Sequence, residues 1–217
     1  CSILFPSHPP LRRRWETDRV NIVLRAARPE PRDAQAYATY LNTAADGFFA
    51  RVFGGDWRRI IAQVCMVPGH ELSLDNVVIA EADGRIVGSC AGGEDAPIPT
   101  GLLARALGWR VPRAALIWIA GFPTTAWLTR RESGDWYLQS IAVDADMRGA
   151  GVGTALFADA VARARAAGAR RMVLDVRVGN DGAKRLYEHL GMVVIGQSPG
   201  PTLPGVHRVE RMGMDLT

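Results

Sequence analysis

The stretch Val143-Asp-Ala-Asp-Met-Arg-Gly-Ala-Gly-Val-Gly-Thr154 decides the fold of this chain. The apolar residues 136–143 lead into it and are typical of a buried strand. Apolar residues at helical spacing lead out of it, namely Val152, Leu156, Phe157, Ala160, Val161 and Ala164. The sequence therefore predicts a strand, a glycine-rich turn and a helix, in that order.

The turn has the chemistry of an anion site. Glycines alternate with other residues at Gly149, Gly151 and Gly153, so the backbone can turn its N–H groups outward. The first turn of the helix that follows adds unpaired N–H donors and a partial positive charge. A phosphate or pyrophosphate is the anion that suits such a site best.

The composition is that of an ordinary globular protein. The 217 residues are 48% hydrophobic and 22% charged, which is enough for one core with a lid or a tail besides. The net charge of +4 comes from scattered basic residues, which argues against a nucleic-acid partner. The apolar residues 114–129 are interrupted by Pro123 and are fewer than the ~20 that a membrane-spanning helix needs, so we expect no membrane partner.

Three cysteines, Cys1, Cys65 and Cys90, stand at irregular spacing. An odd number without a metal-ligand motif indicates neither a disulfide framework nor a zinc site. We therefore expect a reducing, cytoplasmic location and no metal.

The chain is expected to form a single domain over residues 20–217, after a flexible N-terminal extension over the proline- and arginine-rich residues 1–19. Asp83-Gly84 between two apolar runs predicts a β-hairpin. Residues 94–134 are a long excursion between strands and are predicted to be a lid or interface insertion. The fold class is α/β (α+β), a mixed sheet of about seven strands with helices on both faces.

Further elements follow from periodicity and from cap and turn residues. Strands are expected near residues 21–27, 171–176, 192–196 and 208–216. Helices are expected near residues 33–45, 56–67, 101–107, 113–119 and 180–190. Asp33 is expected to cap the first of these helices.

A dinucleotide-binding fold is one interpretation of the glycine-rich turn. Gly149 and Gly151 fit the first two glycines of its fingerprint, and Asp175 stands where a ribose-binding carboxylate belongs. Thr154, however, occupies the position of the third glycine or alanine. The turn also lies too late in the chain for a doubly wound sheet to be completed after it.

A second interpretation rests on two blocks of sequence. Arg148-Gly-Ala-Gly-Val-Gly153 fills the pattern Arg/Gln-x-x-Gly-x-Gly/Ala. Residues 180–192 run Asn-x-x-Ala-x-x-Leu-Tyr-x-x-Leu-Gly-Met. Together the blocks resemble the GNAT superfamily of N-acetyltransferases, in which phenylalanine is common at the position of Met192. The resemblance extends over residues 20–215 and implies a GNAT-like, mostly antiparallel central sheet flanked by helices.

The resemblance implies an N-acetyltransferase that moves acetyl from acetyl-CoA, its co-substrate, to a primary amine by direct attack in a ternary complex. The backbone of residues 141–143 would hold the pantetheine arm like an added strand, with an N–H near Ile141 or Ala142 facing the thioester oxygen. The turn would hold the pyrophosphate. The residues implied in cofactor binding are Ile141, Ala142, Val143, Arg148, Gly149, Ala150, Gly151, Val152, Gly153, Thr154, Asn180 and Lys184.

Tyr187 matches the family position that protonates the departing sulfur, since a phenol with a pKa of about 10 keeps its proton at neutral pH. The alternative is a core residue on the apolar face of its helix. Asn180 is either a helix cap or a cofactor contact. Lys184 either pairs with Glu188 or contacts a CoA phosphate.

The general base is not evident, because Gln139 and Ser140 occupy the central strand where many family members carry a carboxylate. The candidates are a water relay and three carboxylates, Glu81, Glu94 and Asp135.

The acceptor is expected to be a small-molecule or peptide amine, bound by residues 30–70 and 94–134. Arginines in the second stretch favour an acidic or amphipathic acceptor, and the same stretch would also serve as a homodimer interface. Two other functions stay open. One is a non-catalytic acyl-CoA-binding regulatory module, which the missing base favours, and the other is a dinucleotide-binding protein.

Overall fold

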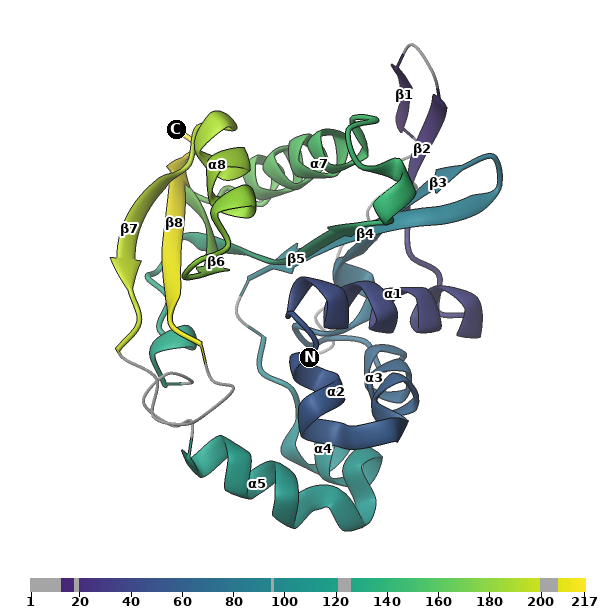
Figure 1. The fold of residues 1–217 in the computed structure, drawn as a ribbon, viewed down its shortest axis with the longest axis vertical. Helices are drawn as coiled ribbons and strands as arrows, with labels where there is room; N and C mark the ends of the chain where they lie inside the picture. Colours follow the sequence, from purple (N-terminus) through teal and green to yellow (C-terminus); the bar gives the residue numbers. More distant parts are fainter. Residues whose placement is uncertain (1–12, 18–19, 95, 121–125, 200–206) are drawn as a thin grey trace, which may run out of the picture.

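The computed structural model describes residues 13–17, 20–94, 96–120, 126–199 and 207–217. Within these residues the strands form one sheet of eight, in the order β1-β2-β3-β4-β5-β6-β8-β7 (Figure 1). The strands are β1 (Arg13–Thr17), β2 (Val20–Ala26), β3 (Val77–Ala82), β4 (Arg85–Gly93), β5 (Asp135–Val143), β6 (Arg171–Arg177), β7 (Val193–Gln197) and β8 (Val209–Asp215). The helices that matter here are α1 (Pro31–Ala44), α2 (Phe48–Phe53), α3 (Trp57–Cys65), α4 (Thr100–Leu107), α5 (Val111–Ala120), α7 (Val152–Ala166) and α8 (Asp181–His189).

Neighbouring strands are antiparallel throughout the sheet except for β5 and β6, which are parallel. This confirms the predicted mixed, mostly antiparallel sheet. The strand count is higher than expected because β1 pairs with β2, where a flexible extension was predicted. The proline-rich composition around residues 13–17 concealed a short proline-free segment that can pair. The rest of the expected extension, residues 1–12 and 18–19, lies outside the described residues.

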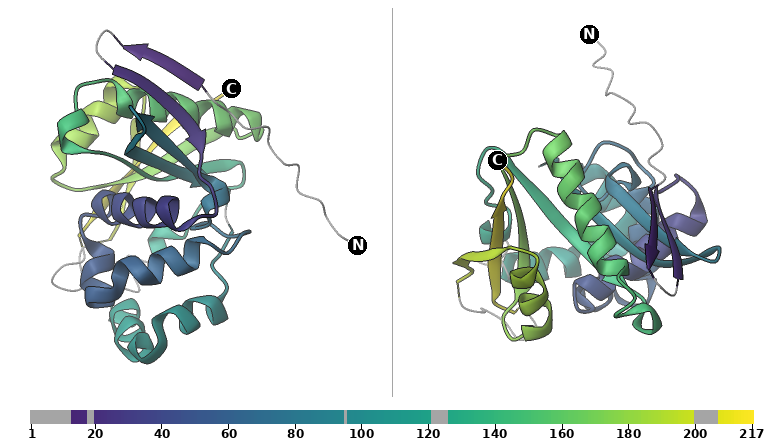
Figure 2. Two further views of the ribbon diagram at one scale, coloured as in Figure 1. Left: turned by 90° about the vertical axis from the view of Figure 1, so that its right-hand side faces the viewer. Right: turned by 90° about the horizontal axis from the view of Figure 1, so that it is seen from above.

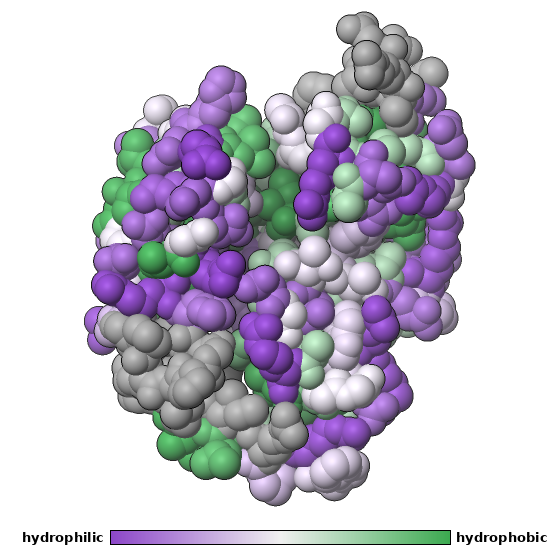
Figure 3. All heavy atoms as spheres, in the orientation of Figure 1, coloured by the Kyte–Doolittle hydropathy of each residue, from purple (hydrophilic) through white to green (hydrophobic). Residues whose placement is uncertain are grey.

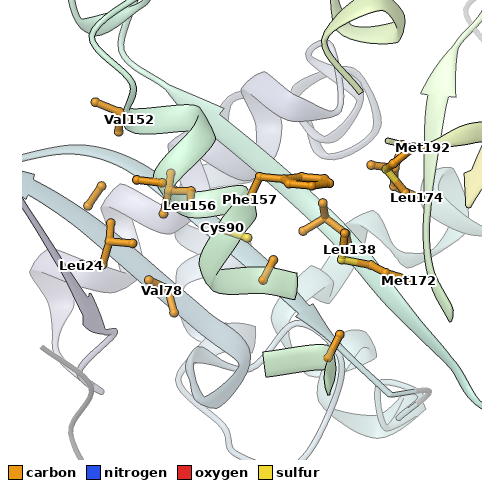
Figure 4. Packing of buried hydrophobic residues seen from close by; sticks show 14 of the residues in the cluster. Leu24, Val78, Cys90, Leu138, Val152, Leu156, Phe157, Met172, Leu174 and Met192 are labelled. Carbon is orange, nitrogen blue, oxygen red and sulfur yellow. The ribbon is translucent and has the colours of Figure 1, made fainter. Parts of the chain in front are cut away.

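Two apolar clusters lie on opposite faces of the sheet. One packs α7 against β3 to β6. In Figure 4 Phe157 is directed toward Leu138, and Leu156 lies on the side of Leu24 and Val78. The other packs α1 and α3 against β3 and β4, with the fully buried Tyr37 on α1 and Ile60 on α3. Figure 2 shows α7 lying along one side of the sheet. The helices therefore cover both faces, as the sequence predicted.

The hairpin between β3 and β4 turns at Asp83 and Gly84, as expected. Both residues have positive φ, 49° and 76°, which suits the right-handed twist of the paired strands. The prediction for Asp33 was wrong, since α1 begins after Glu30 with Pro31 in its first turn. Asp33 is instead fully buried and bonded to Arg25 on β2.

Residues 94–134 contain α4 and α5 close to the predicted positions. α4 packs against α3, and α5 packs against α2, a helix that the sequence did not predict. The proposed role of this insertion as a lid or an interface stays a prediction. None of the described helices is long and apolar enough to cross a membrane.

Candidate active site

The parallel strands β5 and β6 pair only where they begin. The pairing joins residues 135–137 to residues 171–173 and goes no further. Beyond Tyr137, β5 stays paired with β4 on one side, while no described strand pairs with its other edge. Strand pairing uses the backbone N–H and C=O groups of both edges, so the open edge of residues 138–143 offers unpaired donors and acceptors. In Figure 3 the surface is hollowed between the side that carries α8 and the side that carries α1.

A β-bulge interrupts β5 at the same place. Leu138 lies opposite Gly92 and Ser140 lies opposite Ala91, so Gln139 is an extra residue. The bulge exchanges the faces of the strand. Trp136 and Leu138 belong to the cluster under α7, and after the bulge it is Ile141 and Val143 that pack against that cluster.

Two polar side chains mark the bulge on the side of α1. The buried Tyr37 hydroxyl donates to Oε1 of Gln139 over 3.1 Å. Ser140 is 5% exposed, and its Oγ has no hydrogen-bond partner among the described residues. A buried hydroxyl without a partner is costly unless a ligand or water completes it. The bulge therefore presents polar groups that a bound substrate can engage.

The glycine-rich turn ends in an uncapped helix. Gly149 and Gly151 have φ of 78° and 82°, a conformation that glycine adopts readily. No side chain caps α7, and its first helical bond, from the Ala155 N–H to the Gly151 carbonyl, is 2.9 Å long. The amides of residues 152–154 precede that bond, so they are available to an anion. This donor set fits a pyrophosphate, and the exposed Arg148 side chain stands beside it without an ion pair to any described residue.

Tyr187 on α8 packs into the apolar cluster under α7. Its ring centroid lies 6.0 Å from that of Phe157, at an interplanar angle of 38°. Burial, and to a lesser degree the nearby Cys90, raises the pKa of the Tyr187 hydroxyl above its ordinary value. That hydroxyl makes no hydrogen bond to the residues that the structure describes. The Tyr187 ring thus packs as expected of a core residue. Its hydroxyl is protonated and makes no hydrogen bond to a described residue, as a proton donor would require.

Asn180 and Lys184 both have structural partners. The Asn180 side chain accepts a hydrogen bond from the Ala183 N–H over 3.3 Å and caps α8. Lys184 Nζ lies 2.8 Å from Oε2 of Glu210 on β8, whereas the sequence suggested Glu188 as its ion-pair partner. Their roles in cofactor binding stay predictions.

The three candidate bases differ in what holds them. Glu81 lies 2.8 Å from Arg25 and 3.6 Å from Arg32, and the hydrogen bond from Arg25 lowers its pKa. Asp135 is held by Arg171 through both carboxylate oxygens, at 2.9 and 3.0 Å. Glu94 is exposed and forms no ion pair with a described residue.

Glu94 also lines a small pocket beside the bulge. The Arg131 guanidinium lies 4.0 Å above the ring of Tyr137 in this pocket and 3.5 Å from Glu71. Sequence reasoning missed the pocket because it is assembled across the end of β4, the bulge and the end of the insertion. Its lining residues are Glu71, Gly92, Gly93, Glu94, Arg131, Tyr137 and Gln139.

Two observations exclude the dinucleotide-binding interpretation. One is the mostly antiparallel sheet, and the other is the set of hydrogen bonds that Asp175 makes. Its carboxylate accepts two hydrogen bonds from Arg211, both of 2.9 Å, and one of 3.0 Å from the Tyr137 hydroxyl. The side chain is 5% exposed. It is therefore not available to a ribose.

Comparison with known proteins gives a consistent result. Residues 25–192 match the family model described as acetyltransferase (GNAT) family. A search of curated proteins found no match. The fold is similar to that of an N-acetyltransferase from Staphylococcus aureus Mu50, with a TM-score of 0.63 and 17% identity, covering 88% of this chain and 99% of that one.

Two further crystal structures are similar over most of their length. One is described only as an acetyltransferase, with a TM-score of 0.59, 20% identity and coverage of 89% of this chain and 99% of that one. The other is a GNAT-family acetyltransferase from Streptococcus pneumoniae, with a TM-score of 0.53, 20% identity and coverage of 90% and 99%. At such identities the likeness shows the fold alone.

Proposed function

This chain belongs to the GNAT family of acetyltransferases, as the two sequence blocks predicted, and we propose that it acetylates a primary amine by direct attack within a ternary complex with acetyl-CoA. It is an acyltransferase, and its family uses acetyl-CoA. The observation that carries the proposal is the open edge of β5 beyond Tyr137, which adjoins both the bulge at Gln139 and the turn before α7.

The open edge of β5 and the glycine-rich turn would bind different parts of acetyl-CoA. Backbone groups of Ile141, Ala142 and Val143 would hydrogen-bond the pantetheine arm as a further strand would. The amides of residues 148–154 would hold the pyrophosphate, helped by the partial positive charge at the start of α7. Because these contacts use the backbone, they depend on the bulge and on the glycine conformations more than on side-chain identity.

The chemical step needs a polarised thioester and a proton donor for the leaving sulfur. A backbone N–H at Ile141 or Ala142 would stabilise the negative charge on the carbonyl oxygen as the amine nitrogen bonds to the carbonyl carbon. When the C–S bond breaks, the Tyr187 O–H would donate its proton to the thiolate. The raised pKa of Tyr187 keeps its hydroxyl protonated at neutral pH, so a proton is available to the sulfur as the C–S bond breaks.

Glu94 is the carboxylate best placed to take the proton that the amine must lose. Glu81 and Asp135 are each held by arginines, whereas Glu94 lines the pocket that contains Gln139 and Tyr137. An ammonium entering this pocket would meet Glu94, either directly or through one water, and would reach the bulge as a neutral amine.

Two measurements test the proposal together. Titration calorimetry with acetyl-CoA should show binding, and an acceptor screen with a thiol-detecting reagent should show CoA release with at least one class of amine. Absence of binding at millimolar acetyl-CoA would refute it. Binding without thiol release over a broad amine panel would favour the non-catalytic acyl-CoA-binding module instead.

A further inference from the structure

The helix α5 turns an apolar face to solvent. Val111, Leu116 and Ile119 are 36%, 68% and 69% exposed. At about 100° per residue, positions 111, 112, 115, 116 and 119 fall within one arc of about 140°. Together with the preceding Trp109 these positions form what we call the α5 face, consisting of Trp109, Val111, Pro112, Ala115, Leu116 and Ile119. Apart from the indole N–H of Trp109, no side chain of this face carries a polar group.

The face lies at one end of the molecule. The side of α5 that carries Ala114 packs inward against the cluster under α1 and α3. In Figure 3 apolar surface appears at the lower end of the molecule, where Figure 1 draws α5. Single exposed apolar residues are ordinary, but several in one arc of one helix indicate an interaction surface.

Basic residues outnumber acidic ones in the helices at this end of the molecule (Figure 1). The segments 48–66 and 100–120, which hold α2, α3, α4 and α5, contain a single acidic residue, Asp56. The whole chain has a net charge of +4, so these segments account for all of its positive excess. Their basic residues are Arg51, Arg58, Arg59, Arg105, Arg110 and Arg113.

Trp109 lies where the apolar surface of α5 meets the basic residues. Its side chain is 80% exposed, the largest exposed fraction among the exposed large apolar residues described. The Arg110 guanidinium lies 4.4 Å from the centre of its ring and also 2.5 Å from Asp56. Tryptophan beside arginine, next to an aliphatic helix face, is the combination found where proteins meet the headgroup region of a bilayer.

We propose that the α5 face binds the surface of an anionic lipid bilayer. Leu116 and Ile119 enter the boundary between headgroups and acyl chains, Trp109 lies at headgroup level, and the surrounding arginines meet the lipid phosphates. The sequence-based expectation of no membrane partner depended on the length of an apolar run. Length decides whether a helix spans a bilayer, and it does not decide whether a helix lies on one.

Charge and chemistry favour this partner over two others. A second copy of the chain would bring two arginine-rich ends together, and like charges across an interface are unfavourable. A nucleic acid would attract the arginines, but aliphatic side chains such as Val111, Leu116 and Ile119 have little to contact on a phosphate backbone. Only a lipid surface satisfies both the charge and the apolar stripe.

The test is co-sedimentation of the whole chain with vesicles. One set contains phosphatidylcholine alone, and the other contains phosphatidylcholine with about one third phosphatidylglycerol, each at about 0.1 M and about 0.5 M salt. We expect binding to the anionic vesicles that weakens at the higher salt. The double variant Leu116→Gln, Ile119→Gln should reduce the partition coefficient at least tenfold, at about the scale expected for two apolar side chains. Arg105→Gln should reduce it by a smaller factor.

A matched control is Val193→Gln, where Val193 is 63% exposed and belongs to β7, a strand that lies apart from α5 in Figure 1. It should leave vesicle binding unchanged, and circular dichroism should show that every variant is folded. Absence of binding to anionic vesicles at low salt would overturn the proposal. So would a loss of binding that is equal in the Val193 control, a dimer in light scattering that the double variant abolishes, or binding to duplex RNA in place of vesicles.

Discussion

The hydroxyl of Tyr37 donates a hydrogen bond to Oε1 of Gln139 over 3.1 Å, and this bond joins α1 to the bulge in β5. Tyr37 is fully buried, and burial raises its pKa well above the ordinary value, so it remains a neutral donor. Gln139 lines the pocket beside Glu94. Helix α1 thereby fixes the Gln139 side chain at the point where the open edge of β5 begins.

Tyr37→Phe should separate this positioning role from folding. The ring stays, so the loss in the free energy of unfolding should be about 1 kcal/mol, the ordinary contribution of one hydrogen bond. A freely rotating Gln139 should lower kcat/KM for the acceptor about three- to tenfold while leaving acetyl-CoA affinity unchanged. Urea denaturation, steady-state kinetics and calorimetry measure the three quantities. Unchanged acceptor kinetics would show that Gln139 needs no partner.

Tyr187→Phe should slow turnover by about a hundredfold, because the leaving thiolate loses its acid. Phenylalanine retains the packing against Phe157, so stability and acetyl-CoA affinity should change little. The measurement is thiol release at saturating substrates, with calorimetry as the control for binding. Full turnover in this variant would assign Tyr187 to the core alone.

The sequence was informative where structure is local. Asp83-Gly84 predicted a hairpin and the glycines at 149 and 151 predicted a turn, because both features depend on a few adjacent residues, and all four residues have positive φ in the structure. The bulge at Gln139 has no such signal. It depends on the register against β4, with Leu138 opposite Gly92 and Ser140 opposite Ala91, which only the assembled sheet decides.

The partners of charged side chains were predicted poorly, because they also depend on tertiary structure. Lys184 was given a neighbour one helical turn away, but the chain brings Glu210 from β8 to within 2.8 Å. Asp33 was given a local capping role, and its partner is Arg25 on the preceding strand. Charged side chains are long and few, so their partners follow tertiary contacts more than spacing in the sequence.

Glu94→Gln should change the pH dependence of the reaction. The pocket then keeps only the carboxylate of Glu71, which lies 3.5 Å from Arg131, so kcat/KM at pH 7 should fall about tenfold or more. The loss should shrink as pH rises toward the amine's pKa of about 10, since a neutral acceptor needs no base. Glu81→Gln is the matched control, because Glu81 is held by Arg25 and its loss should affect stability and not the pH profile. Parallel pH profiles for the wild type and Glu94→Gln would favour a water relay.

Gly149→Ala and Gly153→Ala form an informative pair. Gly149 has φ of 78°, so alanine there is strained by about 1 kcal/mol although a Cβ would meet nothing within 4 Å. Gly153 is helical, and its Cβ would lie 3.8 Å from Val143, so alanine should stabilise α7 by about 0.5–1 kcal/mol. Acetyl-CoA affinity, measured by calorimetry, should fall much more for Gly149→Ala. Equal losses would indicate steric exclusion of the cofactor in both variants.

The buried pair of Arg25 and Asp33 should make stability fall at acid pH. Burial alone would raise the pKa of Asp33, but hydrogen bonds from Arg25, at 2.5 and 2.9 Å, and from the Arg28 amide outweigh it and lower the pKa below 3.8. The stabilisation is therefore complete above about pH 4 and is lost as pH falls through the lower, folded-state pKa. Asp33→Asn should cost about 3 kcal/mol at pH 7 and should remove the fall in stability at acid pH, because Arg25 is left buried with Glu81 as its remaining ion-pair partner. Glu30→Gln, which removes an exposed pair with Arg28, should cost under about 0.5 kcal/mol. Urea denaturation between pH 7 and pH 3 measures both, and equal costs for the two variants would show that the buried pair adds no net stability.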